Sequence, residues 1–211
     1  VMGNLTQEIK EIIRGDVNDS PEIKEAFSHD ASMFELRPEL VVAPKDSADV
    51  QAVVRYVSAQ KKHNHKLSVT VRSGGTCMSG GSINDSIILD FNKYLHAIGP
   101  VSKTSAHVQP GTFYRDFEKE TLKHGVLMPS FPASRELCTV GGMVANNAGG
   151  ERSLQYGKTE EFIESIRVVL RDGNEYEMKK LTKKQLDKKM AQKDFEGRLY
   201  RDVYELCEQN Y

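Results

Sequence analysis

Apolar and polar positions repeat with different periods along this chain, and these periods predict its elements. A valine stripe within residues 50–57 follows the i, i+3, i+4, i+7 spacing of one helix face, and Asp46 stands in the N-cap position ahead of it. Short runs rich in β-branched residues at 39–44, 67–71 and 87–91 predict strands around this helix. The order strand, helix, strand, loop, strand is typical of a small α/β lobe with a partly parallel sheet.

The second half of the chain follows a different pattern. Residues 106–109 predict a strand, and Thr112 is placed to cap a helix over 113–123. Apolar residues alternate on both sides of Asp172-Gly173, which predicts a β-hairpin over 166–178. We therefore expect an α+β second half with antiparallel strands.

A break in the pattern at Gly99-Pro100 suggests a boundary between two lobes. We expect an N-terminal helical segment at 1–37, a first lobe at 38–100 and a second lobe at 101–211. Within the second lobe, residues 179–211 are expected to form a helical insertion.

Helical stripes stand near both ends of the chain. Residues 4–14 are weakly amphipathic, and Leu199, Val203 and Leu206 line one face of a helix near the other end. Between them, residues 179–193 hold seven lysines and one acid. We interpret this run as a solvated helix face rather than an anion-binding patch, because no aromatic residues are interleaved.

Composition narrows the function classes. The 29 Lys and Arg residues against 30 Asp and Glu give a net charge of −1, which argues against a nucleic-acid partner. No apolar run approaches the ~20 residues of a membrane span, and no signal peptide pattern is present. The cysteines, Cys77, Cys138 and Cys207, and the six histidines lack the spacing of a disulfide framework or a metal site. We expect no bound metal, and a location in the cytoplasm or peripherally at the inner face of a membrane.

The segment after the strand at 67–71 is glycine-rich. Residues 72–82, RSGGTCMSGGS, hold four glycines, which permit positive φ and let consecutive N–H groups surround an anion. We favour a phosphate cradle over a flexible linker, because predicted strands flank the segment. The Walker A pattern fails because Gly81 stands at its lysine position, and the G-x-G-x-x-G spacing is absent.

A second glycine-rich segment lies at 129–152. Gly141-Gly142 and Gly149-Gly150 are places where backbone can approach a flat ligand, and Asn146-Asn147 supplies amide donors and acceptors. Tight packing through small residues is the alternative for this segment alone.

The two segments together resemble the FAD-binding domain of the p-cresol methylhydroxylase and vanillyl alcohol oxidase superfamily. They are most similar to the FAD-linked D-lactate, glycolate and D-2-hydroxyacid dehydrogenases of the large type fused to an iron–sulfur module. The resemblance runs from about Phe27 to Tyr176 and includes residues 38–54, 72–82 and 132–150. It implies a two-lobed α+β domain, with a small α/β lobe and a second lobe of mixed or antiparallel sheet and flanking helices.

The resemblance also implies which residues contact FAD. The loop residues assigned to the pyrophosphate are Arg72, Ser73, Gly74, Gly75, Thr76, Cys77, Ser79 and Gly80. Pro132 and Ser134 would line the adenosine-diphosphate path. The isoalloxazine and ribityl portions would meet Cys138, Thr139, Gly141, Gly142, Asn146, Asn147, Gly149 and Gly150. Tyr156 and Gly157 would close the pocket, and Ile166 would offer backbone to the adenine.

Two loop positions qualify this assignment. Family members that attach FAD covalently use a histidine where this chain has Thr76, so we expect non-covalent FAD. Many hydroxyacid dehydrogenases have glycine where this chain has Cys77, and we favour a packed cysteine over a reactive thiol.

The activity implied is oxidation of a D-2-hydroxy acid, such as D-lactate or glycolate, to a 2-oxo acid. A base removes the hydroxyl proton while hydride passes to flavin N5. In this family the base and the carboxylate clamp lie in a separate substrate domain, and nothing after Gly173 resembles it. We expect a nearly inactive fragment, with its catalytic residues and an iron–sulfur electron acceptor in the missing part. The alternatives are the FAD domain of a sugar-acid or aldonolactone-type oxidase, and a non-catalytic nucleotide-binding module.

Overall fold

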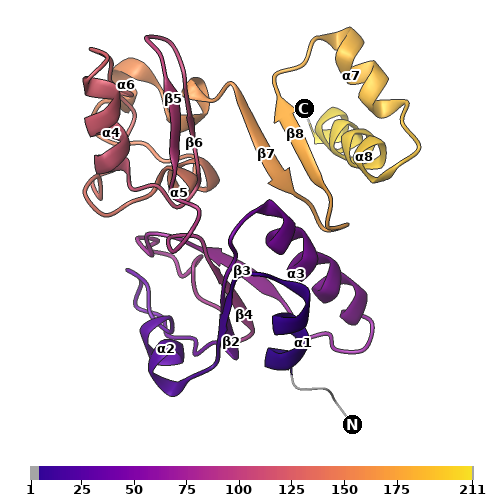
Figure 1. Cartoon of the computed structure of the whole chain (residues 1–211). Coiled ribbons are helices and arrows are strands. Elements are labelled where there is room, and N and C mark those ends of the chain that lie inside the picture. The colour runs from indigo at the N-terminus through magenta and orange to yellow at the C-terminus, as the bar shows by residue number, and fades with distance from the viewer. Residues whose placement is uncertain (1–4, 211) are drawn as a thin grey trace. The chain divides into compact units, whose positions relative to one another are not determined.

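The strands and helices form largely where the sequence pattern predicts them. The structure is a computed structural model, and it describes residues 5–210. In chain order the elements are α1 (Leu5–Ile12), β1 (Asp16–Asn18), α2 (Pro21–Ala26), β2 (Leu40–Ala43), α3 (Ser47–Gln60), β3 (Val69–Arg72), β4 (Ile87–Asp90), β5 (Ile98–Val101), β6 (Ala106–Val108), α4 (Tyr114–Leu122), α5 (Val140–Ala145), α6 (Ser153–Tyr156), the 3₁₀ helix η1 (Thr159–Phe162), β7 (Ser165–Val169), β8 (Glu175–Lys179), α7 (Lys183–Met190) and α8 (Phe195–Asn210) (Figure 1). The predicted α+β class is confirmed. Asn4, where the first helix was expected to begin, lies outside the described residues.

The chain divides into two compact units. Residues 5–163 form the first together with Val169–Glu175, and Glu164–Val168 form the second with residues 176–210. The second unit contains α7 and α8, which the sequence assigned to an insertion within the second lobe. None of the helices over residues 5–210 has the length and hydropathy needed to cross a membrane.

The first unit contains a four-stranded sheet in the order β1-β2-β4-β3. Strands β2, β4 and β3 are parallel and β1 is antiparallel to β2, which confirms the predicted partly parallel sheet. Buried side chains of β2 and β4 pack with Ile9 of α1 and Val53 of α3 in one hydrophobic cluster. Val41 and Ile88, which point to the other face, are buried as well. Strands covered on both faces have the continuous apolar composition seen in these runs.

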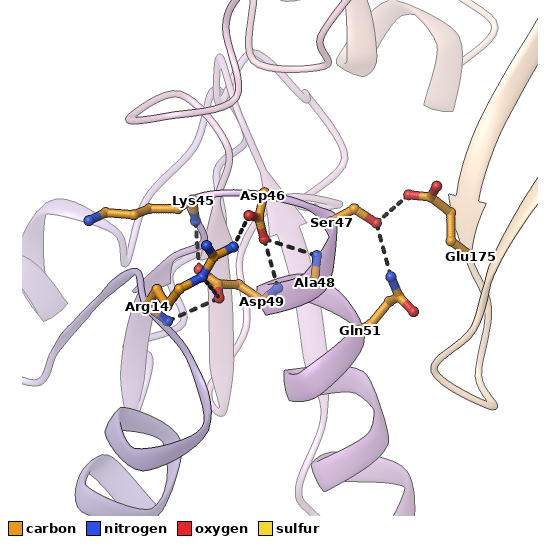
Figure 2. Close-up of polar contacts among 8 residues, drawn as sticks. All are labelled: Arg14, Lys45, Asp46, Ser47, Ala48, Asp49, Gln51 and Glu175. Atoms are coloured by element: carbon orange, nitrogen blue, oxygen red, sulfur yellow. Dashed lines mark hydrogen bonds and ion pairs between the residues drawn. The ribbon is translucent and has the colours of Figure 1, made fainter.

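The N-terminus of α3 is held by two carboxylates (Figure 2). Asp46 caps the helix, as predicted, by accepting hydrogen bonds from the backbone N–H groups of Ala48 at 3.0 Å and Asp49 at 3.2 Å. The buried Asp49 carboxylate accepts from the backbone N–H groups of Arg14 at 3.0 Å and Lys45 at 2.9 Å. The Arg14 guanidinium also pairs with Asp46. These contacts join the residues after α1 and β2 to the start of α3.

Strands β7 and β8 form the hairpin that the sequence predicts, and the turn between them packs against α3. Gly173 has a φ of +77°, and a Cβ on it would lie 2.0 Å from Cγ of Arg55. The Arg55 guanidinium donates to Oδ1 of Asn174 at 3.1 Å. The Ser47 hydroxyl donates to the Glu175 carboxylate (Figure 2). Contacts with side chains of α3 therefore hold this turn in place.

A second hydrophobic cluster surrounds Tyr114 and Phe117 of α4 and Met143 of α5. Strands β5 and β6 form an antiparallel pair beside it, and Ile98 packs against the cluster. Residue 100, the expected lobe boundary, lies within β5, where the pairing with β6 shifts register between Ile98 and Val101.

The prediction that Thr112 caps α4 is wrong. Phe113 occupies the N-cap position of this helix and makes no side-chain capping bond. The Thr112 hydroxyl donates instead to the carbonyl of Ala97 at 3.4 Å, and the Thr112 carbonyl accepts from the Val140 N–H at 2.9 Å. Both groups of Thr112 are thus engaged by segments distant in the sequence.

Helices α7 and α8 pack together in the second unit. A capping box between Thr182 and Gln185 starts α7. Lys189 of α7 pairs with the buried Glu196 of α8, and Nζ of Lys183 lies 4.9 Å from the ring centre of Tyr204. Lysines of this run therefore contribute to helix packing through their ion pairs and their contacts with aromatic rings.

Candidate functional site

The glycine-rich loop begins where β3 ends. Arg72, the last residue of β3, is in register with Asp90, the last residue of the parallel strand β4. The loop therefore leaves the sheet at the carboxyl edge of its parallel strands, where open α/β sheets commonly bind ligands. Gly75 and Gly80 have φ values of +64° and +79°, which side-chain-bearing residues rarely adopt.

Backbone N–H groups of this loop are free to bind an anion. Among the described residues, none accepts a hydrogen bond from the N–H groups of residues 74 to 78. Such a run of unengaged N–H groups in a turn of glycines suits phosphate oxygens. The loop therefore fits the pyrophosphate of the cofactor that the sequence suggests.

The start of the loop is joined to the N-terminus of α5. The Ser73 hydroxyl hydrogen-bonds that of Thr139, and Thr139 caps α5 by accepting from the Gly142 N–H at 3.3 Å. A Cβ on Gly74 would lie 2.6 Å from the carbonyl oxygen of Leu137, so only glycine allows this close approach. The structure thus brings together loop and helix residues that lie about sixty positions apart in the sequence.

The first turn of α5 offers few free donors. The N–H of Val140 donates to the Thr112 carbonyl and that of Gly141 donates to the Pro110 carbonyl, both at 2.9 Å. The Gly142 N–H is taken by Thr139. Because the N–H groups that make a helix N-terminus attractive to anions are engaged here, the loop is the better phosphate site.

Arg72 connects the start of the glycine-rich loop to the segment after α2. Its guanidinium donates to the carbonyls of His29 at 2.5 Å and Phe27 at 3.4 Å, and lies 5.2 Å from the ring centre of Phe27. Burial lowers the pKa of Arg72, and the nearby carboxylates of Asp30 and Asp90 oppose this effect. These contacts hold the segment after α2 against the loop, and a direct contact of Arg72 with the cofactor stays a prediction.

The thiol of Cys77 is turned into the loop. Sγ accepts a hydrogen bond from the Gly81 N–H at 3.3 Å and lies 3.3 Å from the Ser79 hydroxyl oxygen. The hydrogen bonds from Ser79 and Gly81 lower the pKa of this thiol. Cys138 differs, because it is buried in the second hydrophobic cluster and burial raises its pKa.

Packing explains several glycines of the second glycine-rich segment. A Cβ on Gly141 would lie 2.6 Å from the Pro110 carbonyl oxygen, and one on Gly150 would lie 2.1 Å from that of Phe131. Gly142 is less restricted, because its nearest neighbour would be the Thr139 hydroxyl at 3.2 Å. Close packing of small residues, the alternative considered from the sequence, therefore accounts for Gly141 and Gly150.

The remaining predicted contacts occupy varied environments. Asn147 has a φ of +44° and its Oδ1 accepts from the Glu160 N–H at 3.1 Å, whereas the neighbouring Asn146 is exposed. A Cβ on Gly149 would lie 2.7 Å from the Ser153 hydroxyl. The partly buried positions are Thr76, Pro132, Ser134 and Gly157, whereas Ser79 and Tyr156 are exposed. Ile166 belongs to the second unit, and its contact with the adenine stays a prediction.

The structure adds residues that sequence reasoning did not select. Asn92 donates through Nδ2 to the Ser73 carbonyl at 2.9 Å, and its own Oδ1 is buried without a hydrogen-bond partner among the described residues. Asp30 accepts from the Ser82 hydroxyl at 2.9 Å. Hydrogen bonds from Ser32 and Ser82 outweigh burial and lower the pKa of Asp30. The contacts that join Asn92 to Ser73 and Asp30 to Ser82 connect positions far apart in the sequence, so no local motif marks them.

A model of the FAD binding domain matches residues 38–179, which include the glycine-rich loop and α5. This chain belongs to the FAD binding domain family. The family assignment agrees with the free N–H groups in the loop, and it confirms the flavin-binding family expected from the sequence.

Two hydroxy-acid dehydrogenases are among the relatives of this chain. D-2-hydroxyglutarate dehydrogenase of Escherichia coli is 28% identical over 209 residues, which are 98% of this chain and 20% of the relative. D-lactate dehydrogenase of Archaeoglobus fulgidus is 32% identical over 136 residues, which are 64% of this chain and 29% of the relative. The chain thus spans only a fifth to a third of the length of these proteins.

Solved structures support the fold of the family. 6-Hydroxy-D-nicotine oxidase of Arthrobacter nicotinovorans matches with a TM-score of 0.67 at 24% identity, over 79% of this chain and 36% of that one. An alkyldihydroxyacetonephosphate synthase matches with a TM-score of 0.68 at 22% identity, over 82% of this chain and 34% of that one. At these identities the likeness concerns the fold alone.

Proposed function

We propose that this chain is the FAD-binding part of a flavin oxidoreductase and that it holds FAD without a covalent bond. The observation that carries the proposal is the run of free N–H groups at residues 74–78, within the region that matches the family. A backbone cradle binds a diphosphate without needing basic side chains, which suits the net charge of −1. Thr76 offers no imidazole for a covalent flavin bond.

The residues of this chain bind and orient the cofactor, while the redox chemistry comes from the flavin, which accepts hydride when bound. The loop N–H groups bind the pyrophosphate. The Ser73–Thr139 contact keeps the loop beside α5, and Asn92 donates a hydrogen bond to the Ser73 carbonyl. These residues are positioning residues, since they act by holding the loop.

The parent enzyme, in the same proposal, oxidises a D-2-hydroxy acid to a 2-oxo acid. The names of the relatives, D-2-hydroxyglutarate and D-lactate dehydrogenases, support this substrate class over a sugar acid. The alignment with the Escherichia coli relative covers 98% of this chain, so it includes the lysine-rich helices as well as the loop. The general base, the substrate carboxylate clamp and the iron–sulfur electron acceptor are proposed to lie in other parts of the enzyme.

Titration of the purified chain with FAD, followed by flavin fluorescence, tests the binding proposal. Ser79→Glu places a negative charge in the exposed part of the loop, and Thr104→Glu makes the same charge change in an exposed turn between β5 and β6. We expect Ser79→Glu to weaken FAD binding by at least about tenfold, equivalent to about 1.4 kcal/mol. Thr104→Glu should bind FAD as the unmodified chain does. Absence of FAD binding, or equal losses in both variants, would contradict the proposal.

Acid precipitation of the FAD-loaded chain tests the non-covalent mode. We expect the yellow colour to remain in the supernatant, whereas colour in the pellet would indicate a covalent bond. The chain should also show no D-lactate-dependent dye reduction, while the complete enzyme should show it with a D-2-hydroxy acid. Appreciable activity of this chain alone would refute the placement of the base outside it.

A further inference from the structure

A histidine and two glutamates meet beside the glycine-rich loop. Glu25 lies in the last turn of α2, and His29 follows it four residues later. An isolated antiparallel β-bridge pairs His29 with Glu35, and the Leu36 N–H donates to the Ser28 carbonyl at 3.0 Å beside it. The backbone therefore brings together three side chains that have no ligand spacing in the sequence.

The donor atoms of these side chains lie close to one another. Nε2 of His29 is 3.6 Å from Oε1 of Glu35 and 4.0 Å from Oε1 of Glu25. One donor atom from each residue falls within 4.8 Å of the other two. All three side chains are exposed, so they can reach a dissolved ion and adjust around it without disturbing the core.

This donor set matches a transition-metal ion. Zinc binds imidazole nitrogen and carboxylate oxygen at about 2.0–2.2 Å, which places the ligands of a tetrahedral ion about 3.4 Å apart. The separations of 3.6 and 4.0 Å from His29 need to shorten only slightly to reach that value, and the glutamate oxygens, within 4.8 Å of each other, approach further by rotation of these exposed side chains. An imidazole with two carboxylates favours zinc, cobalt or nickel over calcium and magnesium, which prefer oxygen ligands alone. We propose that Glu25, His29 and Glu35 form a binding site for a divalent transition-metal ion such as Zn²⁺, with water as the fourth ligand.

The guanidinium of Arg37 also contacts this cluster of side chains. The Arg37 guanidinium lies 3.5 Å from Oε2 of Glu25 and also donates to the Pro21 carbonyl at 3.2 Å. It thus uses the oxygen of Glu25 that is not the one near His29. Arg37 offsets part of the negative charge while leaving Oε1 for the ion.

The site would stabilise the segment that supports the loop. The His29 carbonyl accepts from Arg72, and the Ala31 N–H donates to the Gly75 carbonyl at 3.1 Å. Asp30 accepts from the Ser82 hydroxyl at the other end of the loop. An ion that joins His29 to Glu35 restricts this segment and thereby the loop. If the proposed function holds, metal binding therefore also strengthens FAD binding, since each ligand stabilises the same conformation.

Isothermal titration calorimetry of the tag-free, metal-free 211-residue chain with ZnCl₂ tests the site. We expect one equivalent to bind, with the dissociation constant raised at least about tenfold in His29→Ala and in Glu35→Gln. The control is the double variant His63→Ala, His65→Ala, which removes two exposed histidines elsewhere and should bind like the unmodified chain. Circular dichroism of the metal-free variants checks that each is folded. Equal binding by His29→Ala and the unmodified chain, or loss only in the control, would overturn the proposal.

The effect on FAD is measured separately. Zn²⁺ is expected to lower the dissociation constant for FAD in the unmodified chain and to have no such effect in Glu35→Gln. A chain that binds Zn²⁺ at this site but never binds FAD would refute the proposed function and leave the metal site standing. A chain that binds FAD but shows no His29-dependent Zn²⁺ binding would refute the metal site alone.

Discussion

Replacing Thr139 by valine should destabilise the chain by about 2 kcal/mol, because the buried hydroxyl at this position makes two hydrogen bonds. One is the capping bond from the Gly142 N–H, and loss of an N-cap costs about 1 kcal/mol. The other joins Thr139 to the Ser73 hydroxyl, and a hydrogen bond of this kind contributes about 1 kcal/mol. Valine keeps the shape of threonine, so little of the loss should come from packing.

Urea unfolding in the absence of FAD, followed by circular dichroism, measures this change. Thr139→Ser keeps the hydroxyl and removes one buried methyl group, so it should cost only about 0.8 kcal/mol. Ser73→Ala and the double variant complete a thermodynamic cycle, in which the two substitutions should show a coupling free energy of about 1 kcal/mol. Stability of Thr139→Val within about 0.5 kcal/mol of the unmodified chain, or full additivity with Ser73→Ala, would refute the reasoning.

Three other outcomes follow from the structure. Asp49→Ala leaves two backbone N–H groups without their acceptor and should lower stability in thermal denaturation by about 2–4 kcal/mol, whereas a change below about 0.5 kcal/mol would mean that water replaces the carboxylate. Gly150→Ala should cost about 1–3 kcal/mol because its Cβ would lie 2.1 Å from the Phe131 carbonyl oxygen, and an unchanged Tm would show that the loop can shift. The lowered pKa of Cys77 makes its thiolate available at a lower pH than usual. The pH profile of Cys77 alkylation, followed by peptide mass spectrometry, should therefore move to higher pH in Ser79→Ala, which removes a hydrogen bond to the thiol. An unmoved profile would contradict the role of Ser79.

Much of the first lobe could be predicted from local patterns. The β-branched runs became β2, β3 and β4, and Asp46 caps α3 as its position before the valine stripe suggested. These features depend on side chains within a few residues of one another, so the sequence alone contains their cause. The same holds for the glycine-rich loop, where Gly75 and Gly80 do adopt positive φ.

The candidate site was predicted less completely, because hydrogen-bond partners are chosen in three dimensions. Thr112 and Thr139 both precede a helix and both can cap it, yet only Thr139 does so. The carbonyl of Ala97 lies within reach of Thr112 and takes its hydroxyl. Arg72 was predicted to contact the cofactor, and that contact stays a prediction, but no sequence pattern indicated that its guanidinium also binds carbonyls more than forty residues earlier.

By itself, the sequence determined the α+β class, the glycine-rich loop and its likeness to flavin-binding domains, because periodicity and glycine spacing are local properties. Only the tertiary structure decided that the loop rather than α5 keeps free N–H groups, since the donors of α5 are engaged by carbonyls around Pro110 and Thr112. It also decided that His29 lies between two glutamates, because a backbone bridge, and not a sequence interval, joins His29 to Glu35. Local patterns set the conformation of each segment, whereas the packing of distant segments determines which polar groups are already paired and which can bind a ligand.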